Sequence, residues 1–326
     1  MKRAIVTGAT GMIGTALTKI LLNARVEVVA VIRPSSGHRE RFVKEMDRLG
    51  NVKENLHIVT ADLSEIGSDE ALASIKRAFK SESCDVVFHL GWEGTFGEGR
   101  NDAELQARNV SDTLELAWLS YRMGADVFVG TGSQAEYGRV SNGEKLSWVT
   151  MTKPETEYGK AKLRAGIESR AICRSLRVRH IWCRILSVYG PGDSSGTMVM
   201  SGIYSLLRGE RPQYTRGEQL WDYLYADDAA AALYALASDG VDGKVYALGS
   251  GRVRPLREYI EIIRDTVNPA ADIGIGELPY PPGQVMYLCA DVSDLQKDTG
   301  FEAGTTFEEG IKKTVEWARG QIHEDD

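Results

Sequence analysis

A tyrosine and a lysine lie four positions apart in the stretch ETEYGKAKLRAG, as Tyr158 and Lys162. Four residues is slightly more than one turn of an α-helix, so both side chains would project from one face. A phenol held beside an ammonium can exchange a proton with a substrate oxygen, because the positive charge favours the phenolate. Tyrosine and lysine at this spacing are also common on exposed helices. Alone, the pair therefore favours an ordinary surface helix, and its meaning depends on the rest of the chain.

A glycine-rich stretch, IVTGATGMIG, joins the first predicted strand to the first predicted helix. Gly8 would permit a tight turn, Gly11 would let a pyrophosphate approach the backbone, and Gly14 would let the helix pack closely on the strand. The diphosphate would then lie at the helix N-terminus, where free N–H groups and the helix dipole favour anions. We predict dinucleotide binding. The sequence has no GxxxxGK[ST] motif, which argues against a nucleoside triphosphatase.

The end of the second predicted strand indicates which dinucleotide binds. Sites that prefer NAD place an acid there for the ribose 2′-hydroxyl. In AVIRPSSGHRER that position is Arg33, with Ser35, Ser36 and Arg39 close behind it. Arginine and hydroxyl groups suit a 2′-phosphate, which an acid would repel. We therefore predict NADP, with NAD as the alternative if these residues form only a basic surface loop.

The segments that must position these residues alternate in character. Six short runs rich in Val and Ile are predicted as buried strands: Arg3–Thr7, Val26–Ile32, Leu56–Thr60, Asp85–Leu90, Asp126–Gly130 and Val178–Ile185. Between them, helical periodicity occupies Met12–Asn23, Asp69–Lys80, Asp102–Met123 and Glu155–Ser175. This alternation predicts an α/β fold, a doubly wound parallel sheet of the Rossmann type with helices on both faces.

The pattern changes after about residue 190, where Gly, Pro and Tyr become more frequent. A helix at Ala226–Ser238 and a strand at Lys244–Leu248 are expected to return to the main sheet. We therefore predict a dinucleotide-binding domain of residues 1–190 plus 223–248. Residues 191–222 plus 249–326 would form a smaller carboxyl-terminal lobe that binds the substrate.

Composition excludes several classes of partner. Lys plus Arg number 39 and Asp plus Glu number 46, a formal net charge of −7 that argues against nucleic acid as the main partner. No apolar run approaches the ~20 residues of a membrane span, so no membrane association is expected. The stretch MKRAIVTG leads directly into a strand pattern without an apolar signal region, which predicts a cytoplasmic protein. No HxxxH or HxH pattern is present, so we predict no metal site.

A third segment, VGTGSQAEYG, places Ser133 just past the fifth predicted strand, at the edge of the sheet where ligands bind. With Tyr158, Lys162 and the glycine motif, the chain resembles the short-chain dehydrogenase/reductase superfamily, in its extended branch of nucleotide-sugar epimerases, dehydratases and reductases. The resemblance covers nearly the whole chain. It includes GATGMIG, ADL, HLGW, YGKAK, RILSVYGPGD and GEQLWDYLYADDAAAAL.

The resemblance implies roles for individual residues. Tyr158 would exchange a proton with the substrate oxygen, Ser133 would hold that oxygen by a hydrogen bond, and Lys162 would also bind the nicotinamide ribose. The ammonium and the positive nicotinamide are expected to lower the pKa of the tyrosine. Expected cofactor contacts are Gly8, Thr10, Gly11, Met12, Ile13, Gly14, Arg33, Ser36, Asp62, Leu63, Leu90, Gly91, Tyr158, Lys162 and Ile185. Expected substrate contacts are Trp92, Glu93, Gln134, Glu136, Arg216 and Trp221.

Two residues separate the reactions of this branch. Sugar 4,6-dehydratases follow the Ser or Thr with Asp-Glu, which perform the elimination, whereas this chain has Gln134 and Ala135. GSQAEYG most resembles sugar 4-ketoreductases, so we predict NADPH-dependent reduction of a nucleotide-linked 4-keto-6-deoxyhexose. A nucleotide-sugar 4-epimerase with tightly bound NAD is the alternative, and the Arg33 loop favours the reductase. A non-catalytic NADP-binding regulator is a second alternative, but such proteins typically lose the Tyr or the Lys.

Three positions and the assembly stay open. The family often has arginine before Asp222 to grip the substrate diphosphate, and this chain has Trp221. Compensation is expected from Arg216, Arg252 or Arg254; otherwise the substrate has no diphosphate, or the tryptophan stacks on a base or sugar.

Glu136 replaces an apolar residue that is common before Tyr-Gly, and it either lines the pocket or stabilises the turn. Trp92 is either pocket wall or core. The resemblance implies a possible homodimer through the helices predicted at 102–123 and 155–175, with a monomer not excluded by their periodicity.

Overall fold

The main body of the structure is a parallel β-sheet. The computed structural model describes residues 1–140 and 143–325 of the chain. Its seven-stranded sheet has the order β11-β6-β5-β4-β1-β2-β3, with every neighbouring pair parallel. The strands are β1 (Arg3–Thr7), β2 (Glu27–Ile32), β3 (Leu56–Thr60), β4 (Val86–His89), β5 (Val127–Ser133), β6 (Arg179–Ile185) and β11 (Val245–Leu248). The order reverses between β1 and β4, so the predicted doubly wound α/β fold is confirmed.

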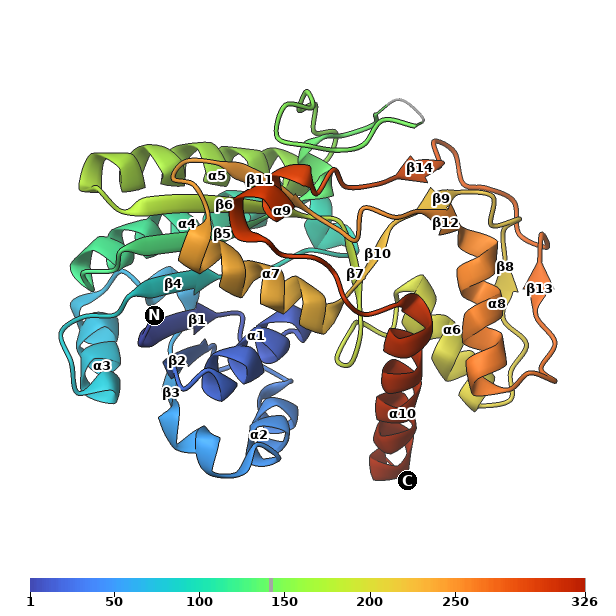
Figure 1. Cartoon of the computed structure of the whole chain (residues 1–326), viewed down its shortest axis with the longest axis horizontal. Coiled ribbons are helices and arrows are strands. Elements are labelled where there is room, and N and C mark those ends of the chain that lie inside the picture. The colour runs from blue at the N-terminus through green and yellow to red at the C-terminus, as the bar shows by residue number, and fades with distance from the viewer. Residues whose placement is uncertain (141–142, 326) are drawn as a thin grey trace.

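Helices cover both faces of this sheet (Figure 1). One face carries α1 (Met12–Asn23), α2 (Arg39–Asp47) and α7 (Ala226–Asp239); the other carries α3 (Asp69–Phe79), α4 (Ala103–Arg122) and α5 (Glu157–Leu176). Short 3₁₀ turns are η1 (Gly50–Asn55), η2 (Leu63–Glu65), η3 (Glu98–Asn101) and η4 (Gln134–Glu136). Because both faces are covered, a strand such as β2, EVVAVI, is continuously apolar after its first residue and does not alternate.

Two element boundaries near the site differ from the predicted ones. Helix α5 begins at Glu157 because the side chain of Thr156 accepts a hydrogen bond from the Gly159 N–H and caps the helix. Strand β5 continues to Ser133, three residues further than predicted, because its ladder with β6 extends to the pair Ser133 and Ile185. Ser133 is therefore the last residue of the strand, held at the edge of the sheet.

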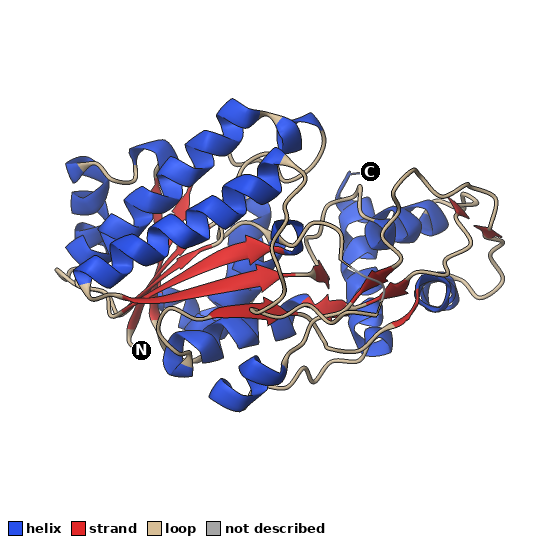
Figure 2. Ribbon diagram, turned by 90° about the horizontal axis from the view of Figure 1, so that it is seen from above, coloured by secondary structure: helices blue, strands red, loops and turns tan. Residues whose placement is uncertain are grey.

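A second group of elements lies beyond the carboxyl ends of the main strands, and the arrowheads of the sheet point toward it (Figure 2). Its strands are β7 (Ser187–Tyr189) with β10 (Tyr223–Tyr225), β9 (Leu220–Trp221) between β12 (Arg254–Pro255) and β14 (Tyr287–Leu288), and β8 (Gln213–Tyr214) with β13 (Gly274–Ile275). Its helices are α6 (Met198–Leu207), α8 (Leu256–Val267) and α10 (Phe307–Asp325).

This second group has an aromatic core of its own. The ring of Phe307 lies 4.7 Å from that of Tyr189 and 4.5 Å from that of Tyr259, measured between centroids. Helix α9 (Ser293–Thr299) is different, because it packs against α7 and β11 of the main body although the sequence pattern groups it with the second lobe. None of the helices described is both long and apolar enough to cross a membrane.

Candidate active site and cofactor site

Two adjoining cavities lie where the carboxyl ends of the main strands face the second group of elements. The first cavity has a volume of about 900 Å³ and the second about 730 Å³. Gly8, Gly11, Leu90 and Trp92 line both cavities, so the two form one continuous site. Ligands of doubly wound sheets bind at this edge, next to the reversal of strand order.

The glycine-rich turn forms the shared wall. Gly8 has a φ of +68°, and a Cβ there would lie 2.6 Å from the backbone nitrogen of Gly91. A Cβ at Gly14 would lie 2.1 Å from the Gly8 carbonyl oxygen, so only glycine lets α1 pack this closely on the turn. Helix α1 has no side-chain cap, which leaves its first N–H groups free for an anion. The turn therefore fits the diphosphate of a dinucleotide.

Ser133, Tyr158 and Lys162 meet at the first cavity, as the sequence predicts. Ser133 ends β5, while Tyr158 and Lys162 lie on one face of α5, and all three side chains are largely buried. Lys162 Nζ donates a 2.6 Å hydrogen bond to the Thr131 carbonyl oxygen and lies 3.8 Å from the centroid of the Trp92 ring. The pair on the helix is thus a buried feature of the site and not a surface decoration.

The protein alone does not lower the pKa of Tyr158. Burial raises it above its usual 10, and the lowering effects of Ser133 and Arg100 are smaller. The expectation of a lowered pKa is therefore corrected: burial outweighs the nearby positive charge. Burial also lowers the pKa of Lys162, from 10.5 to about 7, against the opposing effect of Glu136. Tyr158 is consequently held in its protonated form.

Arg100 is a site residue that the sequence did not reveal. It lies in η3 and lines the first cavity, with its guanidinium carbon 4.6 Å from the centroid of the Tyr158 ring. The chain brings it to the tyrosine across more than fifty positions, and no local pattern in EGRN marks it. Trp92 meets the same ring edge-on at 6.2 Å between centroids, so of its two predicted locations the structure supports pocket wall.

The second cavity contains the basic loop that follows β2. Arg33, Ser36 and Arg41 line it, and the Arg41 guanidinium donates a 3.0 Å hydrogen bond to the carbonyl oxygen of Thr10 in the glycine-rich turn. Arg41 also lies 5.8 Å from the ring centroid of Trp317, a residue of α10 that lines the same cavity.

The predicted site residues divide between the two cavities. Those that line the first are Gly8, Gly11, Met12, Ile13, Gly14, Leu90, Trp92, Ser133, Gln134, Tyr158, Lys162, Ile185 and Trp221. Those that line the second are Gly8, Thr10, Gly11, Arg33, Ser36, Asp62, Leu63, Leu90, Gly91, Trp92 and Glu93. Two predicted substrate contacts, Glu136 and Arg216, line neither.

Two of the predicted substrate contacts are therefore corrected. Glu136 is completely buried, and its carboxylate accepts hydrogen bonds from the Ser133 N–H and from Arg184. Of its two predicted roles, the structure therefore supports stabilising the turn, through a capping box with Ser133. Arg216 is exposed and away from both cavities. Glu93 lines the second cavity, where its carboxylate is 3.9 Å from the Arg33 guanidinium.

The comparisons with known proteins agree with this architecture. The profile of the NAD dependent epimerase/dehydratase family matches residues 4–249. The chain belongs to this family. A dTDP-glucose 4,6-dehydratase of Neisseria gonorrhoeae is 26% identical over 340 residues, which cover 97% of this chain and 95% of the relative. The chain is thus an NAD(P)-dependent enzyme of the oxidoreductase or epimerase type.

Solved structures of epimerases have the same fold. A UDP-glucose 4-epimerase of Thermotoga maritima, solved with UDP-glucose, aligns with a TM-score of 0.82 and 23% identity over 98% of this chain and 99% of its own. A UDP-N-acetylglucosamine 4-epimerase of Methanobrevibacter ruminantium M1, in complex with UDP-N-acetylmuramic acid, aligns with a TM-score of 0.83 and 25% identity over the same shares.

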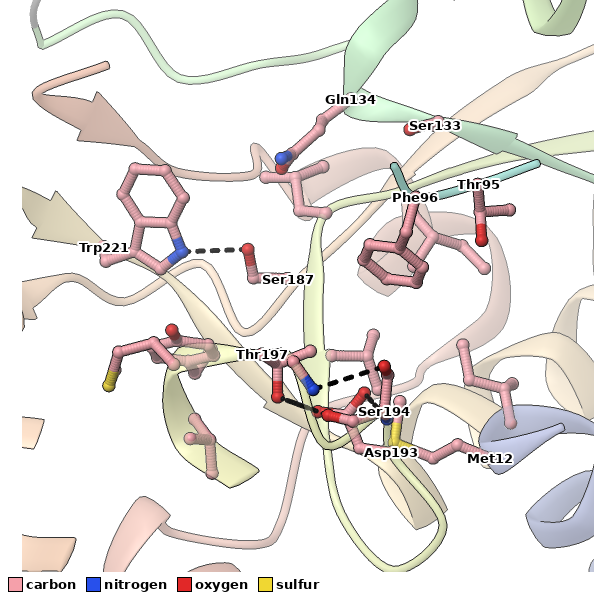
Figure 3. Close-up of a pocket in the computed structure, with 18 of the residues that line it drawn as sticks. Met12, Thr95, Phe96, Ser133, Gln134, Ser187, Asp193, Ser194, Thr197 and Trp221 are labelled. Atoms are coloured by element: carbon pink, nitrogen blue, oxygen red, sulfur yellow. Dashed lines mark hydrogen bonds between the residues drawn. The ribbon is translucent and has the colours of Figure 1, made fainter. Parts of the chain in front are cut away.

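Trp221 stands at the position where the resemblance implies an arginine for the substrate diphosphate. Trp221 lines the first cavity, and its indole N–H donates a 2.8 Å hydrogen bond to the Ser187 hydroxyl (Figure 3). Arg252 lines a separate cavity of about 260 Å³, and Arg254 forms an ion pair with Glu308. Neither of these arginines lines the first cavity. Among the described residues, the arginine that lines it is Arg100.

Four glutamines line the first cavity: Gln134, Gln213, Gln219 and Gln284. The Gln134 carboxamide points into it (Figure 3), and Gln219, just before β9, is almost fully buried at its wall. The side-chain oxygens of Gln134 and Gln219 have no hydrogen-bond partner among the described residues. A buried acceptor without a partner is costly, so each carboxamide would gain by turning toward a donor of a bound ligand. Gln219 was missed in the sequence because a lone glutamine has no spacing signal.

Proposed function

We propose that this enzyme is an NADPH-dependent reductase of a nucleotide-linked 4-keto-6-deoxyhexose. The observation that carries the proposal is the composition of the wall around Ser133 and Tyr158. Gln134 follows the serine where a dehydratase has an acid, and Ala135 does not line the first cavity. Among the described residues, Asp193 is the carboxylate side chain that lines this cavity. It lies at the opposite end of the pocket from Ser133 (Figure 3). Elimination of water has no acid–base pair beside the serine.

The protonation state of Tyr158 supports reduction. Reduction of a ketone adds a hydride to the carbonyl carbon and a proton to its oxygen, and the nicotinamide dinucleotide supplies the hydride when it is bound. Burial raises the pKa of Tyr158, so the phenol carries the proton that the oxygen needs. The Ser133 hydroxyl accepts a hydrogen bond from the Ala135 N–H, which leaves its own hydrogen available for the same oxygen.

The remaining lining supports a carbohydrate. Gln134 and Gln219 each offer an acceptor oxygen to hydroxyl donors, and the Trp221 indole offers a flat apolar face for a sugar or a base. Trp221 and Gln219 come from the carboxyl-terminal segments, which supports assigning residues 191–222 plus 249–326 to a substrate-binding lobe and residues 1–190 plus 223–248 to the cofactor domain.

Arg33 and Ser36 support NADPH. They line the second cavity together with Arg41, so three donors surround the position of a 2′-phosphate. Glu93 favours the alternative, because a carboxylate in the same cavity suits the free ribose hydroxyls of NAD. The ion pair between Arg33 and Glu93 is long, at 3.9 Å, and both side chains are exposed, so a phosphate can displace the carboxylate.

The test is a substrate panel. UDP-, CDP-, GDP- and dTDP-linked 4-keto-6-deoxy sugars are each made in situ by a dehydratase, NADPH oxidation is followed with each, and the product stereochemistry is determined by NMR. We expect stoichiometric NADPH oxidation with one nucleotide. Interconversion of ordinary UDP-hexoses without net NADPH loss would instead favour a 4-epimerase. No turnover with any nucleotide sugar, despite tight NADPH binding, would indicate a substrate without a diphosphate, in keeping with Trp221.

We also propose a homodimer. Helices α4 and α5 pack along each other, and they leave the large apolar side chains of Trp118, Tyr121 and Ile167 exposed. Exposed apolar side chains gathered on neighbouring helices are typical of an interface. Light scattering would detect the dimer, and Ile167→Glu should weaken it.

A further inference from the structure

Glu136 is a completely buried carboxylate that directly follows the active-site wall. Its Oε1 accepts hydrogen bonds from the Ser133 N–H at 2.9 Å and from the Trp182 indole N–H at 3.1 Å. Its Oε2 accepts a 2.7 Å hydrogen bond from Nε of Arg184, whose side chain is also buried. A buried charge is costly unless it is paired and hydrogen-bonded, so this arrangement depends on all three donors.

The surrounding backbone leaves room for this arrangement. A Cβ at Gly132 would lie 2.2 Å from Glu136 Oε1 and 2.4 Å from the indole nitrogen of Trp182. Cβ atoms at Gly130 and Gly166 would lie 2.4 Å and 2.6 Å from atoms of the same indole. The two glycines of VGTGS and Gly166 of α5 therefore make the space in which the tryptophan reaches the carboxylate.

The first consequence concerns Ser133. Glu136 and Ser133 form a capping box, in which the carboxylate binds the serine N–H and the serine hydroxyl accepts from the Ala135 N–H at 3.2 Å. Both the backbone and the side chain of Ser133 are thus fixed. The serine is held with its hydroxyl hydrogen available to a ligand oxygen.

The second consequence concerns Lys162. Three titratable groups lie near Lys162: Glu136 from η4, His89 from β4 and Tyr158 from α5. A fourth, Arg100 from η3, lies against the Tyr158 ring. Burial lowers the pKa of His89 to about 3, so the imidazole is neutral. Within the described residues, Glu136 is the anion that raises the pKa of Lys162 against the effect of burial.

We propose that Glu136 is a positioning residue: its carboxylate fixes Ser133 and supplies the buried negative charge on the side of the site that holds Lys162. This role rests on the catalytic assignment of Ser133 and Lys162 in the proposed function, and it belongs to a residue that touches neither substrate nor cofactor. Both of its effects are present in the protein before any substrate binds, so both can be tested without one.

Two variants separate the charge from the reach of the side chain. Glu136→Gln keeps the shape and removes the charge, so the titration midpoint of Lys162 should fall by on the order of one pH unit. The midpoint is measured by NMR on the full chain labelled with ¹³C at lysine Cε, with the signal assigned by its loss in Lys162→Arg. Glu157→Gln is the matched control, because Glu157 pairs with Lys160 at the surface of the same helix and should leave the midpoint unchanged. An unchanged midpoint in folded Glu136→Gln would overturn the charge role.

Glu136→Asp keeps the charge but is one methylene too short to bind the Ser133 N–H. Amide hydrogen exchange at Ser133 should become faster, by tenfold or more for a lost buried hydrogen bond (about 1.4 kcal/mol), while the Lys162 midpoint stays within the wild-type range. Slow exchange at Ser133 in this variant would overturn the positioning role. If Glu136→Gln does not fold, Glu136→Asp still tests whether Glu136 fixes Ser133. Glu136→Asp also tests the charge role, because a fall of its Lys162 midpoint by about one pH unit would contradict that role.

Kinetics then connect both effects to turnover. With the keto sugar identified by the panel, Glu136→Gln should move the alkaline limb of kcat to lower pH, whereas Glu136→Asp should lower kcat without moving that limb. KM should change little in either, since Glu136 does not contact the substrate. If the wild-type protein reduces no keto sugar, the proposed function fails, while the two NMR measurements still decide the role of Glu136.

Discussion

Replacing Tyr158 by phenylalanine removes one oxygen atom from the active site and leaves its packing in place. Trp92 contacts the Tyr158 ring edge-on, at 6.2 Å between ring centroids, and the Arg100 guanidinium carbon lies 4.6 Å from the ring centroid. Both contacts are made with the aromatic ring, so a phenylalanine keeps them. The loss of a proton donor in general acid catalysis is worth ~100- to 10,000-fold in rate, about 2.7 to 5.5 kcal/mol of activation free energy. Because burial keeps the Tyr158 phenol protonated, we expect a loss of at least ~100-fold in kcat.

The assay compares chemistry with cofactor binding. NADPH oxidation with the keto sugar gives kcat, and quenching of protein fluorescence by NADPH gives its Kd, which should equal that of the wild type. Tyr234→Phe on α7, which lines neither cavity, is the matched control and should leave both quantities unchanged. A Tyr158→Phe enzyme with near-normal kcat and an unchanged Kd would refute the proton-donor role. A simultaneous loss of NADPH binding would show that the variant damages the site and does not isolate the proton.

The other predictions concern cofactor choice, substrate recognition and the buried lysine. Arg33→Ala should weaken NADPH binding by about 1.5–3 kcal/mol and NADH binding far less, as titration with both cofactors would measure; equal weakening would contradict a 2′-phosphate contact. Gln219→Leu should raise KM about tenfold, or more, with little change in kcat, because the acceptor for a substrate hydroxyl is lost; an unchanged KM would remove Gln219 from the substrate site. Lys162→Met should be inactive. Burial lowers the pKa of Lys162 from 10.5 to about 7. Between these pH values Lys162 is protonated in the unfolded chain but has lost its proton in the folded chain. The free energy of unfolding of the wild type should therefore rise with pH over this window, relative to that of Lys162→Met. Denaturant unfolding at several pH values would measure the difference, and parallel pH profiles would contradict it. Gly8→Ala should abolish dinucleotide binding, because the residue needs a positive φ and its Cβ meets the backbone of Gly91.

The parts of the site that the sequence predicts are those carried by local geometry. Gly8, Gly11 and Gly14 have a spacing that only a strand-turn-helix uses, and Tyr158 and Lys162 share a helix face through their spacing alone. The parallel sheet with helices on both faces follows from the alternation of strand and helix patterns along the chain. These features need no knowledge of distant contacts, and the structure has them where they were predicted.

Residues that meet across the chain were predicted less well. Arg100 reaches Tyr158 from a turn without a recognisable pattern, and Glu136 turns inward because Trp182 and Arg184, nearly fifty positions away, supply its partners. A glutamate in an otherwise apolar position carries no local sign of the side to which it will point. Arg216 fails for the opposite reason: an arginine near the expected site in sequence was assigned to it, but its side chain lies at the surface.

The contact between Arg41 and Trp317 has a practical consequence for anyone preparing the protein. The last helix lies at the end of the chain, where affinity tags are usually fused and where truncation is usually regarded as harmless (Figure 1). In this chain that helix supplies Trp317 and Gln321 to the wall of the second cavity, next to the loop of Arg33. Trimming it would remove Trp317 and Gln321 from the wall of the second cavity and Phe307 from the aromatic core of the second group. We therefore expect a protein shortened within this helix to bind its cofactor more weakly.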